Sequence, residues 1–255
     1  MPSSFDRLAL SGDDGPGELV GRVAIARVLD EDPELGEGID TDALAAASQC
    51  ARATVVRLVP GEWQQSSWPA SIRGGFGWLV LDGLLLRRVS MGDRVGVELL
   101  SAGDLLRPWQ REDALASVAR QLGWRVLAPC RLAVLDVDFA RRISAFPQIA
   151  GQLTGRAMRR SRHFAVILAI VQQPKVELRL HMLFWHLADR WGTVRPDGVL
   201  VPLRLTHTVL AELVAARRPT VSSALSALER NGQLARIPDG WVLRGSPPGE
   251  LRPAC

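Results

Sequence analysis

The sequence contains few of the residues on which metal and redox sites are built. Its three cysteines, Cys50, Cys130 and Cys255, lie far apart and form no Cys-x-x-Cys pair. Neither a disulfide framework nor a four-thiolate metal site is therefore indicated. Among the four histidines, His181 and His186 are five residues apart on a predicted helix, so they lie on different faces. We expect no metal site.

A long apolar run is also absent. No uninterrupted apolar stretch approaches the roughly 20 residues that cross a bilayer. The N-terminus lacks the basic and then apolar pattern of a signal peptide. We therefore expect a cytoplasmic protein that has no membrane partner. The 255 residues, 47% of them hydrophobic and 23% charged, are enough for two compact domains.

Lysine is nearly absent as well, and the charge is uneven. Lys175 is the single lysine, so arginine supplies every other cation, which suits phosphate binding. Residues 1–60 contain 11 acidic and 5 basic side chains, a net charge of about −6. Residues 61–171 contain 9 acidic and 15 basic side chains, a net charge of about +6. Residues 172–255 contain 7 acidic and 11 basic side chains, a net charge of about +4. The basic surface therefore belongs to the later part of the chain.

The first half of the chain is predicted to be rich in strands. Residues 1–40 are an acidic segment with a short helix at 19–29, and Thr41 caps a helix at 41–50. Strand periodicity follows, with an inserted helix at 112–121; the predicted strands are 53–63, 76–90, 94–104, 124–127 and 130–135. Several short strands in a row predict a sandwich or barrel over residues 41–145.

A long helix from Pro147 to Val171 follows a short helix at 138–144. At 1.5 Å per residue it is roughly 37 Å long, more than one small barrel can cover. We expect it to pack against the same helix of a second subunit. Its apolar stripe consists of Leu153, Ala157, Phe164, Ile167 and Val171. The alternative is a helix that lies wholly on its own domain, because four arginines interrupt the stripe.

A break at Gln172-Gln173-Pro174 marks the best domain boundary. Residues 146–173 are then the dimerisation helix and hinge, and residues 174–255 a second domain. Within this domain the apolar spacing predicts a helix from Val176 to Trp191 and a strand at 199–205.

The stretch from Leu205 to Arg244 predicts two helices and a hairpin. Thr206 can cap the first helix, and a short turn at 215–217 leads to a second helix that begins at Arg218-Pro219. Asn231-Gly232 ends it, and Asp239-Gly240 predicts a two-residue hairpin turn.

One face of the second helix carries short polar side chains and arginines, which suit a major groove. The candidate DNA-binding residues are Thr206, His207, Arg217, Arg218, Pro219, Thr220, Ser222, Ser223, Ser226 and Arg230. The alternative interpretation is an ordinary helical pair packed on a hairpin.

This arrangement resembles the Crp/Fnr family of bacterial transcription regulators over nearly the whole chain. The stretches FGWLVLDGLLL, VGVELLSAGDLL and LTHTVLAELVAARRPTVSSALSALERNG carry the likeness. The resemblance implies an α+β protein with an N-terminal double-stranded β-helix (jelly-roll) sensor domain related to cyclic-nucleotide-binding domains. It also implies a long dimerisation helix, a C-terminal winged helix-turn-helix, and a homodimer that binds a palindromic site in double-stranded DNA.

The sequence departs from this family at its ligand-binding residues. Gly83, Gly103 and Asp104 stand at the family's turns, but the Gly-Glu pair that holds cyclic AMP is missing, and Pro108 removes a backbone donor. We expect no cyclic-nucleotide binding and no cofactor, since iron-sulfur and haem ligands are also lacking. A pocket for an unidentified effector would involve Trp78, Leu105, Arg107, Trp109 and Arg111. The tryptophans of this half, including Trp63, Trp68 and Trp124, can instead be plain core.

The predicted function is a homodimeric, sequence-specific DNA-binding regulator. The family reads bases with an Arg-Glu pair and a later arginine, and Arg218, Pro219 and Ser223 stand at those positions. An enzyme on the barrel is one alternative, although no nucleophile, base and orienter can be grouped. The other is an effector-binding or protein-interaction module without specific DNA binding.

Overall fold

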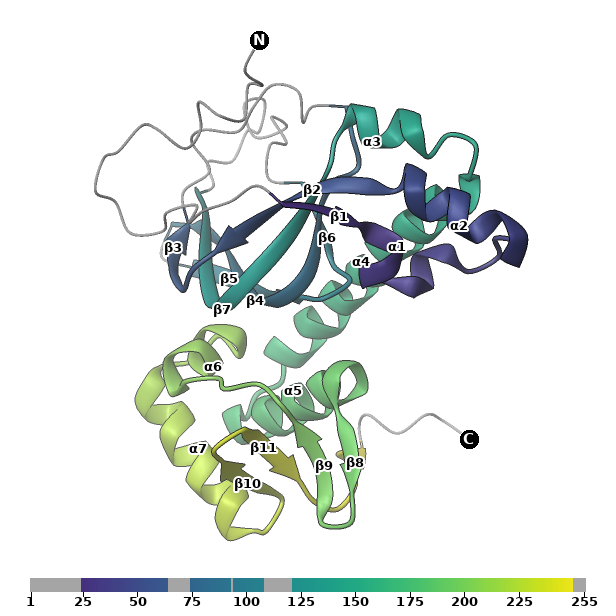
Figure 1. Cartoon of the computed structure of the whole chain (residues 1–255). Coiled ribbons are helices and arrows are strands. Elements are labelled where there is room, and N and C mark those ends of the chain that lie inside the picture. Colours follow the sequence, from purple (N-terminus) through teal and green to yellow (C-terminus); the bar gives the residue numbers. More distant parts are fainter. Residues whose placement is uncertain (1–23, 64–73, 93, 108–120, 250–255) are drawn as a thin grey trace. The chain divides into compact units, whose positions relative to one another are not determined.

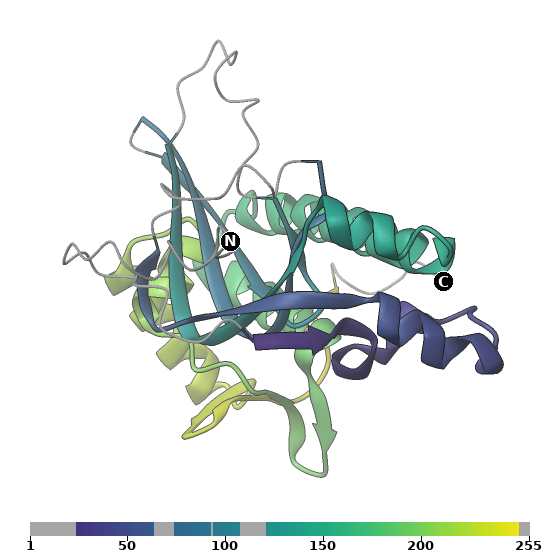
Figure 2. The ribbon, with the colours of Figure 1, turned by 45° about the horizontal axis from the view of Figure 1, so that its top comes forward.

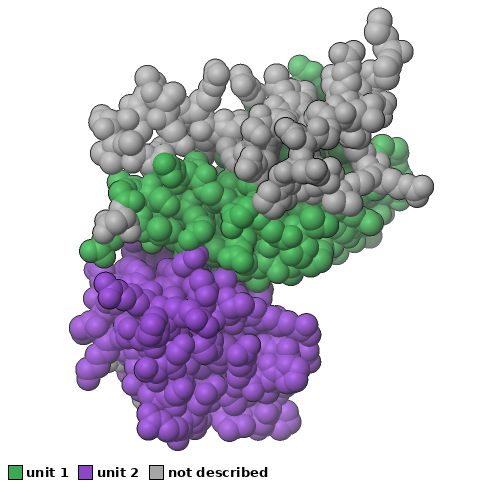
Figure 3. All heavy atoms as spheres, turned by 90° about the vertical axis from the view of Figure 1, so that its left-hand side faces the viewer, with its two compact units in different colours: residues 1–161 green, residues 162–255 purple. Residues whose placement is uncertain are grey.

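The computed structural model describes residues 24–63, 74–92, 94–107 and 121–249. The chain forms two compact units, residues 1–161 and residues 162–255 (Figure 3). Several sequence predictions lie outside the described residues, namely Trp68, Pro108, Trp109, Arg111 and helix residues 112–120. In the described part, no helix is long and apolar enough to cross a membrane.

Unit 1 is built on an antiparallel sheet. Its strands, in spatial order, are β1 (Ala24–Arg27), β2 (Arg52–Leu58), β7 (Gln121–Leu135), β4 (Gly77–Met91) and β5 (Arg94–Ser101) (Figure 1). Two short strands extend it: β3 (Gly61–Trp63) pairs with β7, and β6 (Leu105–Leu106) pairs with β4. The predicted strand 53–63 is thus two strands, because the turn at Val59-Pro60 separates β2 from β3.

Strand β7 corrects the prediction of two strands at 124–127 and 130–135. The backbone continues through Pro129 because a β-bulge accommodates it. Asp82 pairs with Arg131 and Leu84 with Ala128, so one residue of β4, Gly83, faces two of β7. Gly83 has φ +96°, and a Cβ there would lie 2.3 Å from the Pro129 carbonyl oxygen. The glycine is therefore needed for the close approach of the two strands.

The sheet has an apolar core on each face, because successive strand residues point to opposite sides. Leu79 packs with Val28, Leu135, Phe139 and other residues of one cluster. Its neighbour Trp78 packs with a second cluster that includes Trp63 and Trp124. The ring centroid of Trp63 lies 5.8 Å from that of Trp78 and 5.7 Å from that of Trp124. These three tryptophans are buried, as the core interpretation predicts.

The N-terminal part of unit 1 differs from the prediction. The described part of the predicted helix 19–29 is strand β1 followed by a single helical turn, α1 (Val28–Glu31). Residues Ala24–Arg27 pair with β2, and this pairing overrides local helix propensity. Figure 2 shows β1 beside β2. A 3₁₀ helix, η1 (Pro33–Gly36), leads to α2 (Thr41–Cys50), whose N-cap position is Asp40 and not Thr41, without a side-chain capping bond.

Two helices follow the sheet at the predicted places. Helix α3 (Val137–Arg142) is capped by Asp136, whose carboxylate accepts a hydrogen bond of 2.8 Å from the Phe139 N–H. Helix α4 (Pro147–Val171) has the predicted bounds and continues from unit 1 into unit 2. Its residues Ile149 and Leu153 are fully buried in the core of unit 1.

Unit 2 combines three further helices with a four-stranded sheet. The helices are α5 (Val176–Trp191), α6 (His207–Leu213) and α7 (Arg218–Arg230). The strands, in spatial order, are β10 (Leu234–Ile237), β11 (Gly240–Leu243), β9 (Gly198–Val201) and β8 (Thr193–Arg195). The predicted strand 199–205 ends at Val201, because Pro202 has no N–H for a ladder bond. Strand β8 was not predicted.

Candidate nucleic-acid interface

Helices α6 and α7 and the turn between them form the predicted helix-turn-helix. The Thr206 hydroxyl caps α6 by accepting a hydrogen bond of 3.3 Å from the Val209 N–H. The apolar residues that the helical spacing singled out are buried, namely Val209, Leu210, Leu213, Val221, Leu225 and Leu228. Each such side chain contributes roughly 1.5–3 kcal/mol when it is fully buried. Their burial fixes α7 against α6 and leaves the polar face of α7 outside.

The turn between α6 and α7 contains a strained backbone conformation, and an arginine of α5 stabilises it. Ala215 adopts φ +50°, a left-handed conformation that costs a residue with a Cβ about 1–2 kcal/mol. The Arg179 guanidinium donates to the carbonyl oxygens of Val214 at 3.0 Å and Ala215 at 3.4 Å. It also donates to the backbone carbonyl oxygen of Gln173, which precedes α5, at 2.5 Å. Sequence reasoning missed Arg179, because nothing local to residues 205–244 points to α5.

The start of α7 presents positive charge. Arg217 occupies the N-cap position without a side-chain capping bond, and Pro219 lies in the first turn, which has no acidic residue. The backbone N–H groups at a helix start have no intrahelical partners, and the helix dipole is positive there. Arg217, Arg218, Pro219 and Thr220 are all exposed. This end of α7 therefore favours a negatively charged partner.

The remaining candidate residues lie on or beside the same exposed face. Thr206, Ser223, Ser226 and Arg230 are exposed, whereas His207 and Ser222 are half-buried. His207 Nδ1 and Ser222 Oγ are 2.9 Å apart, so a hydrogen bond joins the start of α6 to the middle of α7. The structure thus brings the ten predicted residues together on one motif.

The hairpin after α7 forms the wing, with one correction. Ile237 pairs with Gly240, so the two-residue loop is Pro238-Asp239 and not Asp239-Gly240. Gly240 has φ +150°, and a Cβ there would lie 2.1 Å from the Val201 carbonyl oxygen. The glycine therefore serves the close approach of β11 to β9, which sequence reasoning did not anticipate. Asp239 pairs with the exposed Arg204 at 3.0 Å, a contact worth little in itself.

The predicted dimer stripe on α4 is only partly available to a partner. Leu153 is fully buried within its own unit and cannot contact a second subunit, so its predicted place in the dimer interface is wrong. Ala157 is exposed, while Phe164, Ile167 and Val171 are half-buried. A different line of exposed residues repeats every three and four positions, and we call it the α4 seam: Gly151, Thr154, Met158, Ser161, Ala165 and Leu168. Met158 is 63% and Leu168 58% exposed.

The predicted effector residues that the structure describes do not converge. Trp78 and Leu105 are buried in different clusters, on opposite faces of the sheet. Arg107 is exposed and donates a hydrogen bond of 3.1 Å to the Gly75 carbonyl oxygen. Trp109 and Arg111 lie outside the described residues. The structure therefore does not bring Trp78 and Leu105 to one pocket.

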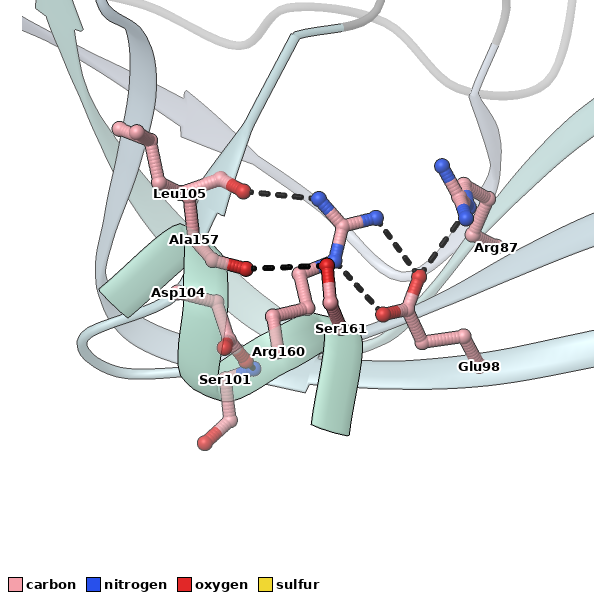
Figure 4. A network of polar contacts seen from close by, with 8 residues as sticks. All are labelled: Arg87, Glu98, Ser101, Asp104, Leu105, Ala157, Arg160 and Ser161. Atoms are coloured by element: carbon pink, nitrogen blue, oxygen red, sulfur yellow. Dashed lines mark hydrogen bonds and ion pairs between the residues drawn. The ribbon is translucent and has the colours of Figure 1, made fainter. Parts of the chain in front are cut away.

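The predicted Gly-Asp turn is present and closely held. Gly103 has φ +86°, and the Asp104 carboxylate accepts a hydrogen bond of 2.8 Å from the Ser101 N–H. Two arginines of α4 bind the same turn. Arg156 donates to the Gly103 carbonyl oxygen at 3.2 Å. Arg160 donates to the Leu105 carbonyl oxygen at 2.9 Å, as Figure 4 shows. The sequence showed these arginines only as interruptions of an apolar stripe.

The environments of His163, His186 and Cys130 are those of packed and partly or fully buried side chains. His163 of α4 and His186 of α5 stack edge to face, with ring centroids 5.2 Å apart. Burial lowers the pKa of His186 to about 4, and the charges of His163 and Arg190 act in the same direction. Burial raises the pKa of the Cys130 thiol to about 12. Among the residues that the structure describes, no group of three or more His, Cys, Asp or Glu side chains could hold a metal ion.

Comparisons with known proteins agree with this architecture. A family model described as the Crp-like helix-turn-helix domain matches residues 178–244. A solved CooA mutant from Carboxydothermus hydrogenoformans superposes with a TM-score of 0.59, at 18% identity, over 87% of this chain and 93% of that protein. FixK2 from Bradyrhizobium japonicum superposes with a TM-score of 0.55, at 17% identity, over 76% of this chain and 93% of that protein. CprK complexed with OCPA gives 0.53 at 14% identity over 78% and 88%. None of the curated proteins matches the chain.

Residues 178–244 therefore form a Crp-like helix-turn-helix domain, which supports a transcription regulator. The chain has the fold of the Crp/Fnr family regulators, as the sequence resemblance predicts. That family is one of regulators and not of enzymes.

Proposed function

We propose that the protein is a homodimeric regulator that binds a palindromic site in double-stranded DNA through α7. The observation that carries the proposal is the exposed start of α7, where Arg217 and Arg218 stand at a positive helix end that has no acidic residue in its first turn. Such an end attracts phosphate, and the short side chains behind it allow the helix to approach base edges. A regulator of this kind acts in the cytoplasm.

The residues of the interface divide into two roles. Arg218 is the base-reading residue, since its guanidinium can donate two parallel hydrogen bonds to O6 and N7 of guanine. Thr206, Thr220 and Ser226 are the proposed phosphate contacts, which set the register without reading sequence. His207 orients the Ser222 hydroxyl through their 2.9 Å hydrogen bond. With proline at position 219 and serine at 223, specificity depends mainly on Arg218.

The α4 seam is the proposed dimer interface. Its exposed Met158 and Leu168 supply apolar surface, and Gly151 and Ala165 are small enough to let two helices approach. Spacings of three and four residues place these side chains on one line of a helix, the pattern of a coiled-coil contact. A two-fold axis along the seam presents two copies of α7 to two half-sites, which is why we expect a palindrome.

The sensor domain has no cyclic-nucleotide function in this proposal. The turn that would precede a phosphate-binding segment is already bound by Arg156 and Arg160. The residues directly after this turn, Leu106 to Trp109, do not include the expected glutamate. We therefore propose that cyclic AMP is not the effector.

Selection of bound sequences from random DNA by the purified full-length protein tests the proposal. We expect a palindromic consensus with at least one guanine in each half-site. Retention on non-specific DNA should fall steeply with salt, because neutralised phosphates release counterions. Binding that ignores salt and yields no consensus would instead favour a protein-interaction module.

A further inference from the structure

Arg156, which is buried, and Arg160, which is largely buried, lie one turn apart and bind α4 to the sheet domain. The side chain of Arg156 is only 6% exposed and that of Arg160 only 16%. Each binds a carboxylate from another element and a carbonyl oxygen of the Gly103–Leu105 turn. A charged side chain that is taken out of water costs several kcal/mol unless it is fully paired. The pairing therefore determines how this part of the helix sits on its unit.

The Arg160 contact has the geometry of a strong ion pair. Its Nε and a terminal nitrogen donate to the two oxygens of Glu98 at 2.6 and 2.7 Å, a parallel fork. Arg87, which lies directly opposite Glu98 on the neighbouring strand, contacts the same carboxylate at 3.1 Å (Figure 4). Burial alone lowers the pKa of Arg160, but Glu98 and Asp104 more than offset it and leave that pKa raised.

The Arg156 contact joins a third part of the domain. Its guanidinium donates to both oxygens of Asp32, one of them at 2.7 Å, and to Glu34 at 3.3 Å. Asp32 lies between α1 and η1, so the segment after β1 is tied to α4 as well. We call Arg156 and Arg160 with Asp32 and Glu98 the arginine clasp.

The charges around the Gly103–Leu105 turn are balanced by the protein itself. Arg87 and Arg160 face Glu98 and Asp104, two cations and two anions. The Arg156 charge is met by Asp32 and Glu34. An anionic effector would have to displace Glu98 from its fork before it could join strand β5 to α4. The bridge that a ligand would make is thus already made by side chains.

We propose that the arginine clasp holds α4 in its DNA-binding position without a bound small molecule, so that the ligand-free protein is the active form. The inference rests on the proposed function, because it concerns the helix that leads into the DNA-binding unit. It goes further by assigning the control of that helix to Arg156, Arg160, Asp32 and Glu98, which act as positioning residues.

Exhaustively dialysed full-length protein and two clasp variants, Glu98→Gln and Arg160→Met, test the proposal. Arg159→Met is the matched control, because Arg159 is the exposed neighbour on the same helix. Hydrogen exchange of residues 147–161 reports the fastening of α4, and the dissociation constant for the selected DNA site reports its consequence. We expect dialysed wild type to bind the site, each clasp variant to bind at least tenfold more weakly with faster exchange, and Arg159→Met to match wild type. Arg160→Lys should recover part of the loss.

Two results would overturn the proposal. The first is a dialysed wild type that binds the site only after millimolar cyclic AMP or inorganic phosphate is added. The second is a set of clasp variants that exchange and bind like wild type. If wild type bound no DNA at all, the proposed function would fail, whereas the exchange of residues 147–161 would still show whether the clasp fastens α4. The two failures are therefore distinguishable.

Discussion

At the scale of single residues, Arg218 has the most specific predicted role. Changing Arg218 to alanine should cost about 1–3 kcal/mol on the selected site and relax the preference at one guanine in each half-site. Thr220→Ala is the comparison, since loss of a phosphate contact should weaken all sequences alike. Titration of each variant on cognate and random duplexes measures the difference. An equal loss on both duplexes for Arg218→Ala would make Arg218 a phosphate contact.

His186 makes the stability of unit 2 depend on pH. Its pKa is lowered from 6.5 to about 4, mainly by burial, so between these values the unfolded chain binds a proton that the folded unit does not. Folding stability therefore rises with pH over this window and is lost as the pH falls from 6.5 towards 4, by up to about 3 kcal/mol. Urea unfolding at several pH values checks this. His186→Gln should flatten the dependence, and an unchanged slope would remove His186 as its source.

Some residue assignments follow from the sequence and others do not. Thr206, Arg218 and Gly103 can be assigned because a cap, a helix start and a turn depend on near neighbours in the chain. Arg179, Glu98 and the His207–Ser222 pair were not assigned. Their partners are distant in sequence or on another element, so no local pattern identifies them.

At the scale of elements, helix periodicity predicted α4, α5 and α7 with their bounds, while strand bounds were less accurate. Strand β7 continues through Pro129 only because a β-bulge in β7, opposite Gly83 of β4, accommodates the proline. The segment Ala24–Arg27 is a strand only because β2 offers a pairing edge. Both depend on tertiary contacts that a single sequence does not display. The exposed face of α4 differs from the predicted apolar stripe for the same reason, since Leu153 is covered by its own unit.

The α4 seam gives a prediction about assembly. Leu168→Glu should weaken association strongly, because it places a charge against apolar surface at the proposed two-fold axis. Arg159→Gln, beside the seam, should leave the dimer intact. Sedimentation at micromolar concentration measures both variants. A wild-type protein that sediments as a monomer, or a Leu168→Glu protein that remains a dimer, would contradict the assignment.

At the scale of the whole molecule, the sensor domain should ignore cyclic nucleotides. The Gly103–Leu105 turn is bound by α4, and the residues directly after it, Leu106 to Trp109, include no glutamate. Calorimetric titration with cyclic AMP and with cyclic GMP should show no heat of binding, and neither nucleotide should change DNA affinity. Saturable binding in the micromolar range would mean that arginines of this domain form a nucleotide site of another design.

The central claim, sequence-specific DNA binding by a symmetric dimer, is tested most directly by selection from random duplex DNA with the purified protein. Two half-sites should emerge with centres about one helical turn, roughly 34 Å, apart, since a two-fold dimer presents two α7 helices to successive major grooves on one side. The affinity for the selected site should exceed that for random DNA by about 10³-fold or more. A pool that remains random after selection, bound with equal affinity throughout, would contradict specific recognition by α7.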